Sequence, residues 1–336
     1  MRMFNPHHAN FTISMRKPWT GMIIAAAALL PGHPVAQSYP VKPVRAILPA
    51  GTGTPTDIVG RAIGQAISPF LGQQIIIENR VGANGIIGME ACMKAAPDGY
   101  TLCLVANAQV GLNPFVYANL PYDPVRDYQP VVQTGSIHNA LSINAALPAN
   151  NFKDFIAYAR TRPGDLNWAS WGTGSPSHLS LAWLEAHTGS KFAHVLYKEP
   201  SMAWLAVQTG EAHAITNPTG MTSAMVKAGK LKALAVGGTR RSEFLPGVPT
   251  FSELGLDFTY RGWNGILAPN GTSRDVIHRV NQAINSLLAD KAFTTKSFLP
   301  LGVEPAGGTP EEFSSFIRQE MKNGQELVRL ANIKPQ

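Results

Sequence analysis

Charged residues and cysteines are both scarce in this chain. Asp, Glu, Lys and Arg make up 15% of its 336 residues, against about a quarter in a typical globular protein, and only two residues are cysteines. A disordered chain is excluded because hydrophobic residues reach 45%. Two cysteines also exclude a disulfide-stapled miniprotein and a cysteine-rich metal site. At roughly 150 residues per domain, the length predicts about two globular domains.

Long apolar runs are missing too, apart from one near the N-terminus. Arg16 and Lys17 precede the apolar run Gly21–Leu30, which is followed by a proline–glycine pair and small residues. This order is typical of a secretory signal peptide, and the run is too short for a membrane span of roughly 20 residues. We therefore expect residues 1–37 to be a signal peptide and the mature protein to be periplasmic. The cleavage site and the start codon stay open.

Little excess charge is left once that segment is set aside. The formal net charge is +7, and without Arg2, Arg16 and Lys17 it is +4, from 25 basic and 21 acidic residues. Such an excess is too small for a surface that tracks phosphates, so we expect no nucleic-acid partner. The nine histidines show no ligand spacing, and we expect no metal. Whether Cys92 and Cys103 form a disulfide stays open, because that depends on their geometry.

Short β-branched runs alternate with longer amphipathic runs from Tyr39 onwards. The predicted strands are Val44–Leu48, Gln74–Glu78, Leu102–Ala106, Val131–Gln133, Leu141–Ile143, Leu166–Ala169, Ala193–Leu196, Ala212–Thr216 and Ala233–Val236. The predicted helices are Asp57–Leu71, Ile86–Ala95, Phe152–Arg160, Ser177–His187, Ala203–Gln208, Met221–Ala228, one capped by Thr272 with Asp275 that ends near Ala289, and one that begins at Thr309-Pro310. Such alternation predicts an α/β fold with parallel strands.

The elements divide into two groups that predict two lobes. We expect residues 38–138 and 262–336 to form lobe 1 and residues 139–261 to form lobe 2. The chain would cross between them near Ser136–Leu141 and Tyr260–Gly265, which describes a hinged clamshell. Each lobe would contain a mostly parallel sheet flanked by helices.

Two loops that join a predicted strand to a predicted helix carry glycines and hydroxyl residues. They are Pro49–Asp57 and Ser170–His178, and each would present N–H groups at a helix start, where anions bind. A dinucleotide site is not favoured, because the first loop lacks the third glycine of G-x-G-x-x-G. A hydrolase is not favoured either, since Pro176 stands where a nucleophile elbow must turn. No cofactor and no catalytic residue are predicted.

Several separated motifs resemble one known family, that of the tripartite tricarboxylate transporter receptors, which are Bug-type extracytoplasmic solute-binding proteins. The motifs follow one another in the family's order from Tyr39 to the end of the chain: Tyr39–Arg45, Pro49–Asp57, Glu78–Gly85, Pro97–Thr101, Leu120–Pro124, Gly172–Leu179 and Ala228–Val236. The resemblance implies a two-lobed periplasmic-binding-protein (Venus-flytrap) fold that closes on a small organic acid and delivers it to the membrane permease subunits of a tripartite transporter. We expect a monomer that is not an enzyme.

Ligand-binding residues follow from the first loop and from the resemblance. The first loop gives Ala50, Gly51, Thr52, Gly53, Thr54, Thr56 and Asp57, and the resemblance implies Asn107, Ala108, Gln109, Ser170, Trp171, Gly174, Ser175, Tyr197, Thr216 and Asn217. The chain departs from the family pattern at Glu199-Pro200, which replaces a glycine, and at Thr216, which replaces an acid. The ligand is therefore either a carboxylate with a cationic amine or a plain or aromatic carboxylate. A periplasmic sensor that presents its closed form to a signalling partner stays a second possibility.

Overall fold

The computed structural model describes residue 12 and residues 39–335, apart from 239 and 259. The predicted signal peptide, residues 1–37, lies outside this range except for residue 12. Within the described range, no helix combines the length and the hydropathy that crossing a membrane requires. Residues 38–336 form one unit.

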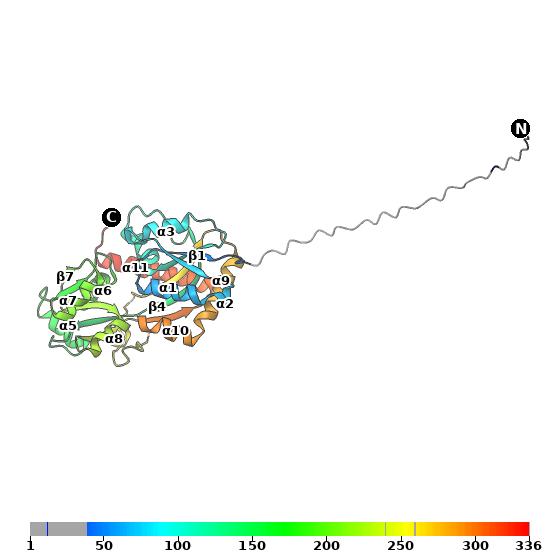
Figure 1. Cartoon of the computed structure of the whole chain (residues 1–336). Helices are drawn as coiled ribbons and strands as arrows, with labels where there is room; N and C mark the ends of the chain where they lie inside the picture. Colours follow the sequence, from blue (N-terminus) through cyan, green and yellow to red (C-terminus); the bar gives the residue numbers. More distant parts are fainter. Residues whose placement is uncertain (1–11, 13–38, 239, 259, 336) are drawn as a thin grey trace, which may run out of the picture. The chain divides into compact units, whose positions relative to one another are not determined.

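The described elements follow the alternation expected from the sequence (Figure 1). The strands are β1 Val44–Leu48, β2 Ile75–Asn79, β3 Thr101–Ala106, β4 Tyr128–Ile137, β5 Asn139–Asn144, β6 Asn167–Ser170, β7 Ala193–Leu196, β8 Ala214–Pro218, β9 Leu231–Val236, β10 Gly262–Pro269 and β11 Val303–Gly307. The helices are α1 Pro55–Ala66, α2 Ser68–Leu71, α3 Ile86–Met93, α4 Asn113–Val116, α5 Phe152–Arg160, α6 Pro176–Thr188, α7 Pro200–Thr209, α8 Thr219–Lys227, α9 Arg274–Leu288, α10 Lys291–Ser297 and α11 Pro310–Leu330.

These strands form two sheets. The first has the order β11-β4-β10-β3-β1-β2 and the second has the order β7-β6-β8-β5-β9. The chain passes from the first sheet to the second between β4 and β5, and it returns between β9 and β10. Strand β10 begins at Gly262, so part of the crossing expected near Tyr260–Gly265 is a strand of the first sheet.

The α/β class and the two helix-flanked sheets are confirmed, but the sheets are mixed rather than mostly parallel. Strands β1, β2 and β3 pair in parallel, as do β6, β7 and β8. Strands β10, β4 and β11 pair antiparallel in the first sheet, and so does β5 with both of its neighbours in the second. Strands β10 and β11 therefore run against the other four strands of the first sheet, and β5 runs against the other four of the second.

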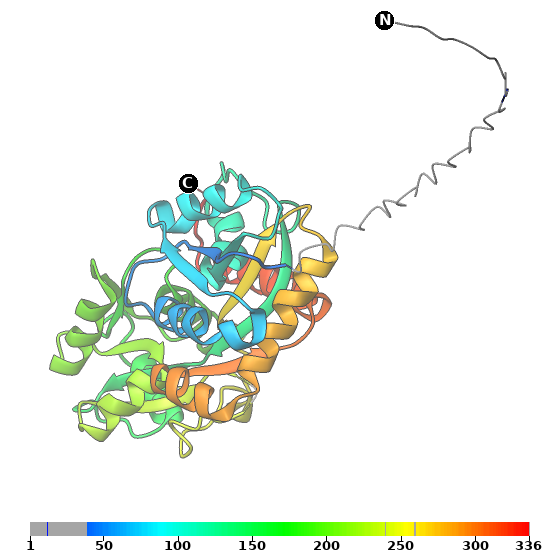
Figure 2. The same cartoon turned by 45° about the vertical axis from the view of Figure 1, so that its right-hand side comes forward.

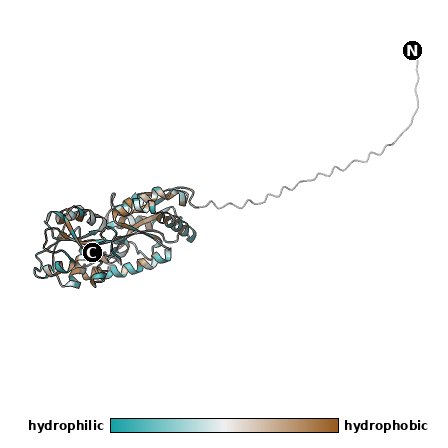
Figure 3. Cartoon of the chain, turned by 90° about the horizontal axis from the view of Figure 1, so that it is seen from below, coloured by the Kyte–Doolittle hydropathy of each residue, from teal (hydrophilic) through white to brown (hydrophobic). Residues whose placement is uncertain are grey.

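Helices cover both faces of the first sheet. Ala46, Leu48 and Leu104 pack on one face against α1 and α9, whereas the alternate residues Ile47 and Cys103 pack on the other face against α3 and α11. This alternation is the period of two that a strand imposes on its side chains. Figure 2 shows α9 and α10 beside α1 and α2, and Figure 3 shows that the helices carry both hydrophobic and hydrophilic residues.

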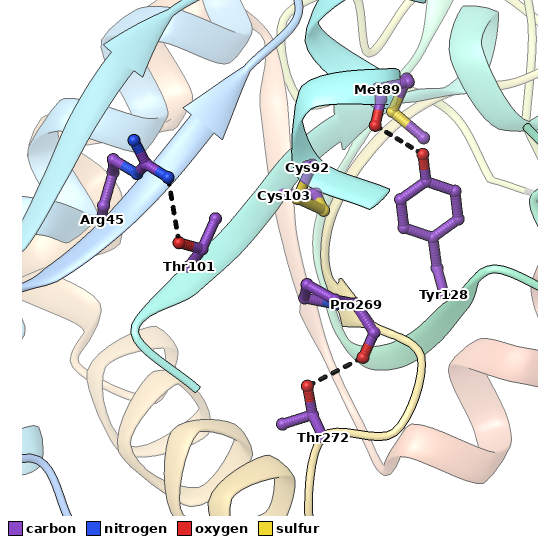
Figure 4. The surroundings of a disulfide bond; sticks show 8 residues. All are labelled: Arg45, Met89, Cys92, Thr101, Cys103, Tyr128, Pro269 and Thr272. Carbon is purple, nitrogen blue, oxygen red and sulfur yellow. Dashed lines mark hydrogen bonds between the residues drawn. A yellow bond between two sulfur atoms is a disulfide. The ribbon is translucent and has the colours of Figure 1, made fainter. Parts of the chain in front are cut away.

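A disulfide joins Cys92 in α3 to Cys103 in β3, which answers the question that the sequence leaves open (Figure 4). Both cysteines are fully buried between α3 and the first sheet. Close by, the Tyr128 hydroxyl donates a hydrogen bond of 2.7 Å to the carbonyl of Met89. The bridge and this bond attach α3 to the first sheet at two places.

The C-terminal helix α11 contacts both groups of elements. Its first half packs on the first sheet through Phe313 and Ile317. Its last turns contribute Leu327 and Val328 to the core built around α5, α6 and Trp168 of the second sheet. Beyond the two crossings, α11 is therefore a third physical link between the sheets.

Candidate functional site

Helices α1 and α6 begin with the same local structure. In each, a glycine precedes a hydroxyl N-cap and a proline at the first helical position: Gly53-Thr54-Pro55 and Gly174-Ser175-Pro176. The φ angles of the two glycines are +78° and +76°, in the left-handed region that favours glycine. Thr54 accepts a hydrogen bond from the N–H of Asp57, as Ser175 does from the N–H of His178.

Each glycine donates its N–H to the side chain at the third helical position. Gly53 donates to Asp57 Oδ2 and Gly174 donates to His178 Nδ1, both at 3.0 Å. These two N–H groups are therefore not available to an anion, contrary to the simplest interpretation of the loops. The N–H groups of Thr52, Thr54 and Thr56, and those of Gly172, Thr173 and Ser177, have no acceptor among the described residues. Four of them, on Thr52, Thr54, Gly172 and Thr173, belong to residues that line the cavities described below, and these four are the candidate anion donors.

Asp57 is a buried carboxylate that holds the first loop in place. It accepts hydrogen bonds from Gly53, from Asn79 Nδ2 at 2.9 Å and from Arg61. Burial opposes its ionisation, but the hydrogen bonds from Gly53, Asn79 and Arg61 and the charge of Arg61 outweigh burial and hold the pKa of Asp57 below its usual range. Asp57 was predicted to contact the ligand, whereas its contacts are all within the loop and its surroundings.

His178 supports the second loop in the same way. Its ring stacks on that of His194 with centroids 4.3 Å apart, and His194 Nε2 forms a hydrogen bond of 2.6 Å with Ser170 Oγ. Burial lowers the pKa of His178 to about 4, with a smaller contribution from His194. Burial also lowers the pKa of His194. The pair is therefore neutral at neutral pH, and Nδ1 of His178 stays an acceptor.

Two cavities adjoin the loops, and Trp171 and Pro176 line both of them. The larger cavity has a volume of about 530 Å³ and is lined by Thr52, Gly53, Thr54, Pro55, Ile137, Asn139, Trp171, Pro176, Glu199, Pro200, Ser201, Trp204, Pro218 and Gly262. The smaller has a volume of about 410 Å³ and is lined by Asn84, Ala108, Leu112, Val116, Tyr117, Trp171, Gly172, Thr173, Gly174, Ser175 and Pro176. Each cavity takes lining residues from the parts of the chain on both sides of the crossings, and because the two cavities share Trp171 and Pro176 we refer to them together as the cleft.

Seven predicted ligand residues line this cleft, and the others lie behind it. The seven are Thr52, Gly53, Thr54, Ala108, Trp171, Gly174 and Ser175. Gly51 accepts from Thr54 Oγ1 through its carbonyl, and the carbonyl of Ala50 accepts from Asn79. Both therefore shape the first loop from the side away from the cavities.

Four more predicted residues lie behind the cleft on the first sheet or its adjoining helix. Thr56 donates a hydrogen bond of 2.8 Å to Asn264 in β10. Asn107 donates to the carbonyl of Arg261, and Gln109 accepts from the N–H of Ala106. With Asp57, these residues are buried and make their contacts inside the protein.

The predicted residues of the second sheet that do not line either cavity are also bonded internally. Ser170 is fully buried against His194, and the Tyr197 hydroxyl donates to Glu211. Asn217 accepts from Ser142 and from Thr222, and the N–H of Thr216 donates to Ser177 Oγ. These residues have partners inside the protein, but Thr216 Oγ1 and Asn217 Nδ2 are buried with no hydrogen-bond partner among the described residues.

Several lining residues were not predicted. Trp204, Asn139, Ile137, Pro218 and Gly262 line the larger cavity, and Asn84 lines the smaller. Ile137, Asn139 and Gly262 lie at the two crossings, which the sequence does indicate as the place where the lobes meet. Trp204 had no signal of its own, because a tryptophan on an amphipathic helix is usually a core residue. Among the described residues, no three His, Cys, Asp or Glu side chains are grouped as metal ligands.

The comparisons with known proteins agree with this geometry. A model of the tripartite tricarboxylate transporter family receptor matches residues 59–333. The chain belongs to this family. BugT of Bordetella pertussis is 32% identical over 314 residues, which cover 92% of this chain and 95% of BugT. The resemblance inferred from the sequence motifs is therefore confirmed.

Two solved structures with bound ligands are similar to this receptor. The structure of R. palustris Rpa4515 with adipate has a TM-score of 0.78 and 29% identity, and the match covers 89% of this chain and 100% of that one. MatC from Rhodopseudomonas palustris with bound malate has a TM-score of 0.73 and 27% identity, over 86% of this chain and 100% of that one. The receptor fold and a solute-binding role follow from family and fold together.

Proposed function

We propose that this receptor captures a small organic carboxylate in its cleft and delivers it to the membrane subunits of a tripartite tricarboxylate transporter. The predicted signal peptide supports a periplasmic location for this step. Adipate and malate are the ligands of two similar proteins, and both are small carboxylates. The family's name supports the transporter as the partner.

One observation supports a carboxylate ligand most directly: the helices α1 and α6 begin with the same local structure on either side of the cleft. Each holds its glycine rigidly through the side chain of the third helical residue, and each has two residues that line a cavity and whose N–H groups have no acceptor among the described residues. Free N–H groups at a helix N-terminus, together with the helix dipole, bind anions. Neither cavity is lined by Lys or Arg, so neutral donors would balance the charge. Such donors can bind a carboxylate, and the adipate and malate bound by two similar proteins favour a carboxylate over a phosphate.

Closure of the two lobes is the second part of the proposal. Residues 38–138 with 262–336 would move against residues 139–261 about the two crossings, and a ligand that binds both loops would favour the closed form. The last turns of α11, which pack on the second lobe, would have to slide or flex during this motion. We expect scattering at small angles to show a smaller radius of gyration with a saturating ligand. An unchanged radius would contradict closure.

Calorimetry with matched ligands tests whether the receptor binds its ligand as a carboxylate. Adipate, malate and the other acids that stabilise the protein in a thermal-shift screen would each be compared with the corresponding amide and phosphate analogue at neutral pH. A ligand at 100 times its Kd stabilises the fold by about 2.7 kcal/mol, which such a screen detects. We expect the acid to bind at least tenfold more tightly than either analogue. An amide that binds as tightly as its acid would show that the loops do not bind an anion.

A further inference from the structure

The larger cavity is lined by two tryptophans whose rings pack edge to face. Trp171 follows β6 and Trp204 lies in α7, and their ring centroids are 6.3 Å apart with an angle of 76° between the planes. Both rings line the cavity, and both pack on the core formed by Ala169, Ala203 and Val207. Their positions are therefore fixed from behind, while the cavity side stays open to a ligand.

Glu199 is the one charged residue among those that line this cavity. It occupies the N-cap position of α7, yet its side chain makes no capping hydrogen bond. Within the described part of the chain, its carboxylate has no hydrogen bond and no ion pair, although its backbone carbonyl accepts from Met202 and Ala203. Lys198, its neighbour in the sequence, is exposed, as Glu199 itself is, but Lys198 does not line the cavity.

A carboxylate lining an apolar cavity, with no cation lining it, repels a second negative charge and attracts a positive one. Two indole rings at nearly a right angle have the same preference, because a cation binds to the face of an aromatic ring and is bound most strongly by tryptophan. Four prolines also line the cavity and supply no N–H donor: Pro55, Pro176, Pro200 and Pro218. The side chains of Glu199, Trp171 and Trp204 therefore favour the opposite charge from the one that the N–H groups of the first loop, at Thr52–Thr54, favour.

We propose that the ligand is a zwitterion: a carboxylate whose other end is a quaternary ammonium group that rests against Trp171 and Trp204 and is balanced by Glu199. This inference rests on the proposed function, since the loops are assigned to the carboxylate end. It resolves the ambiguity that the sequence leaves at Glu199-Pro200, and it separates this receptor from one that binds a dicarboxylate such as adipate.

Charge isosteres test the proposal. The probes are trimethylammonio carboxylates with one to four methylenes between the two groups, each paired with the carbon isostere that carries a tert-butyl group in place of trimethylammonium. Adipate and malate are the plain carboxylates of the set. We expect at least one trimethylammonio compound to bind at least about tenfold more tightly than its tert-butyl isostere by calorimetry, since cation–π contact and an opposite charge act together.

Two variants locate the preference. Glu199→Gln and Trp204→Leu should each reduce the tenfold ratio within the pair to less than about threefold. Glu243→Gln removes the same charge from an exposed position outside the cleft and should keep the ratio. A wild-type ratio near one, or a ratio that Glu199→Gln leaves unchanged, would overturn the proposal.

Binding of the plain carboxylates, adipate and malate, distinguishes failure of the zwitterion proposal from failure of the proposed function. If adipate or malate binds and no trimethylammonio compound does, the zwitterion is wrong while carboxylate capture stands. If no carboxylate of any kind binds, the assignment of the loops fails and the zwitterion fails with it. Every result of the series therefore supports or overturns the proposal that the ligand has a cationic end.

Discussion

The backbone N–H of Gly53 donates to the carboxylate of Asp57 four residues further along, at 3.0 Å. Gly174 makes the same bond to His178 at the same distance in the other half of the protein. One geometry is therefore built twice, once with a carboxylate acceptor and once with an imidazole. The two loops should respond differently to mutation and to pH, because a carboxylate and an imidazole lose their acceptor role by protonation at different pH values.

Replacement of Asp57 tests the first loop. Asp57→Ala removes the acceptor for Gly53 and leaves Arg61 without its ion pair, so we expect a loss of about 2–3 kcal/mol in the free energy of unfolding and at least tenfold weaker ligand binding. Urea denaturation and calorimetry measure the two effects. Asp275→Ala is the matched control, since Asp275 also lies in the first turn of a helix but is exposed. Equal losses for both variants would show that Asp57 has no special role.

The left-handed conformation of Gly53 gives a second test. A Cβ at Gly53 or at Gly164 would meet no atom within 4 Å, and the φ angles are +78° and +83°. Gly53→Ala and Gly164→Ala should therefore share a backbone penalty of about 1–2 kcal/mol. Only Gly53 lines the cavity, so we expect affinity to fall with Gly53→Ala alone. Equal affinity for the two variants would remove Gly53 from the binding site.

Much of this architecture could be predicted from local patterns. Strands β1 and β7 and helix α5 have the expected bounds, and the expected capping box at Thr309 and Glu312 is present. Helix α9 begins one residue later than expected, because Ser273 rather than Thr272 accepts the capping hydrogen bond. Thr272 instead donates to the carbonyl of Pro269, which Figure 4 shows. Local capping chemistry fixes a helix start to within a residue, and competing hydroxyls decide the rest.

Other elements depend on contacts that the sequence does not reveal. Strand β10 is buried along almost its whole length, so it lacks the alternation that marks a half-exposed strand. Strand β11 is an edge strand with Pro305 in it, which weakens its signal. The predicted helix Asp57–Leu71 is two helices, because Pro69 interrupts the pattern. In the cleft, Trp171 was predicted as a ligand-binding residue, but Trp204 was not. Trp204 lies 33 positions later in the sequence, and it is the packing of α7 that brings it next to Trp171.

The second loop should weaken as pH falls. The pKa of His178 is about 4 in the folded protein and about 6.5 in the unfolded chain, so between these values the unfolded state binds more protons. The free energy of unfolding should therefore fall as pH drops from 6.5 to 4. Protonation of Nδ1 also removes the acceptor for Gly174, so ligand affinity should fall in the same window.

His178→Asn is the matched variant for this pH effect. Asparagine keeps an oxygen acceptor and does not titrate, so we expect its melting temperature and its affinity to vary less between pH 6.5 and 4 than those of the wild type. His194, whose pKa burial also lowers, keeps its own titration, so part of the dependence should persist. Thermal melts and calorimetry across the window measure both quantities. Identical pH profiles for the variant and the wild type would contradict the role of His178.

The disulfide between Cys92 and Cys103 closes a short loop of the chain, with a sequence separation of 11. The loss of chain entropy for a loop of this size corresponds to about 2–3 kcal/mol of stability. We expect the double variant Cys92→Ala, Cys103→Ala to lose roughly that amount in urea denaturation while its ligand affinity stays within about twofold, since the bridge lies beneath α3 and lines neither cavity. A tenfold loss of affinity would show that α3 positions the cleft.

Glu320 in α11 is a buried acid near the return crossing. Burial raises its pKa to about 7, while Arg261, Asn323 and Trp263 act in the opposite direction. The carboxyl of an unfolded chain titrates near 4.5, so between pH 4.5 and 7 the folded state binds more protons and stability falls as pH rises. Glu320→Gln keeps an acceptor for Asn323 Nδ2 and cannot ionise. We therefore expect the variant to be more stable than the wild type by about 3 kcal/mol at pH 8 and to differ little at pH 4.5. Melting temperatures at the two pH values measure this.

Glu311→Gln, exposed on the same helix, should change stability by less than about 0.5 kcal/mol at either pH. Should Glu320→Gln be destabilised at pH 8, the carboxylate would be ionised and paired with Arg261 in the folded protein.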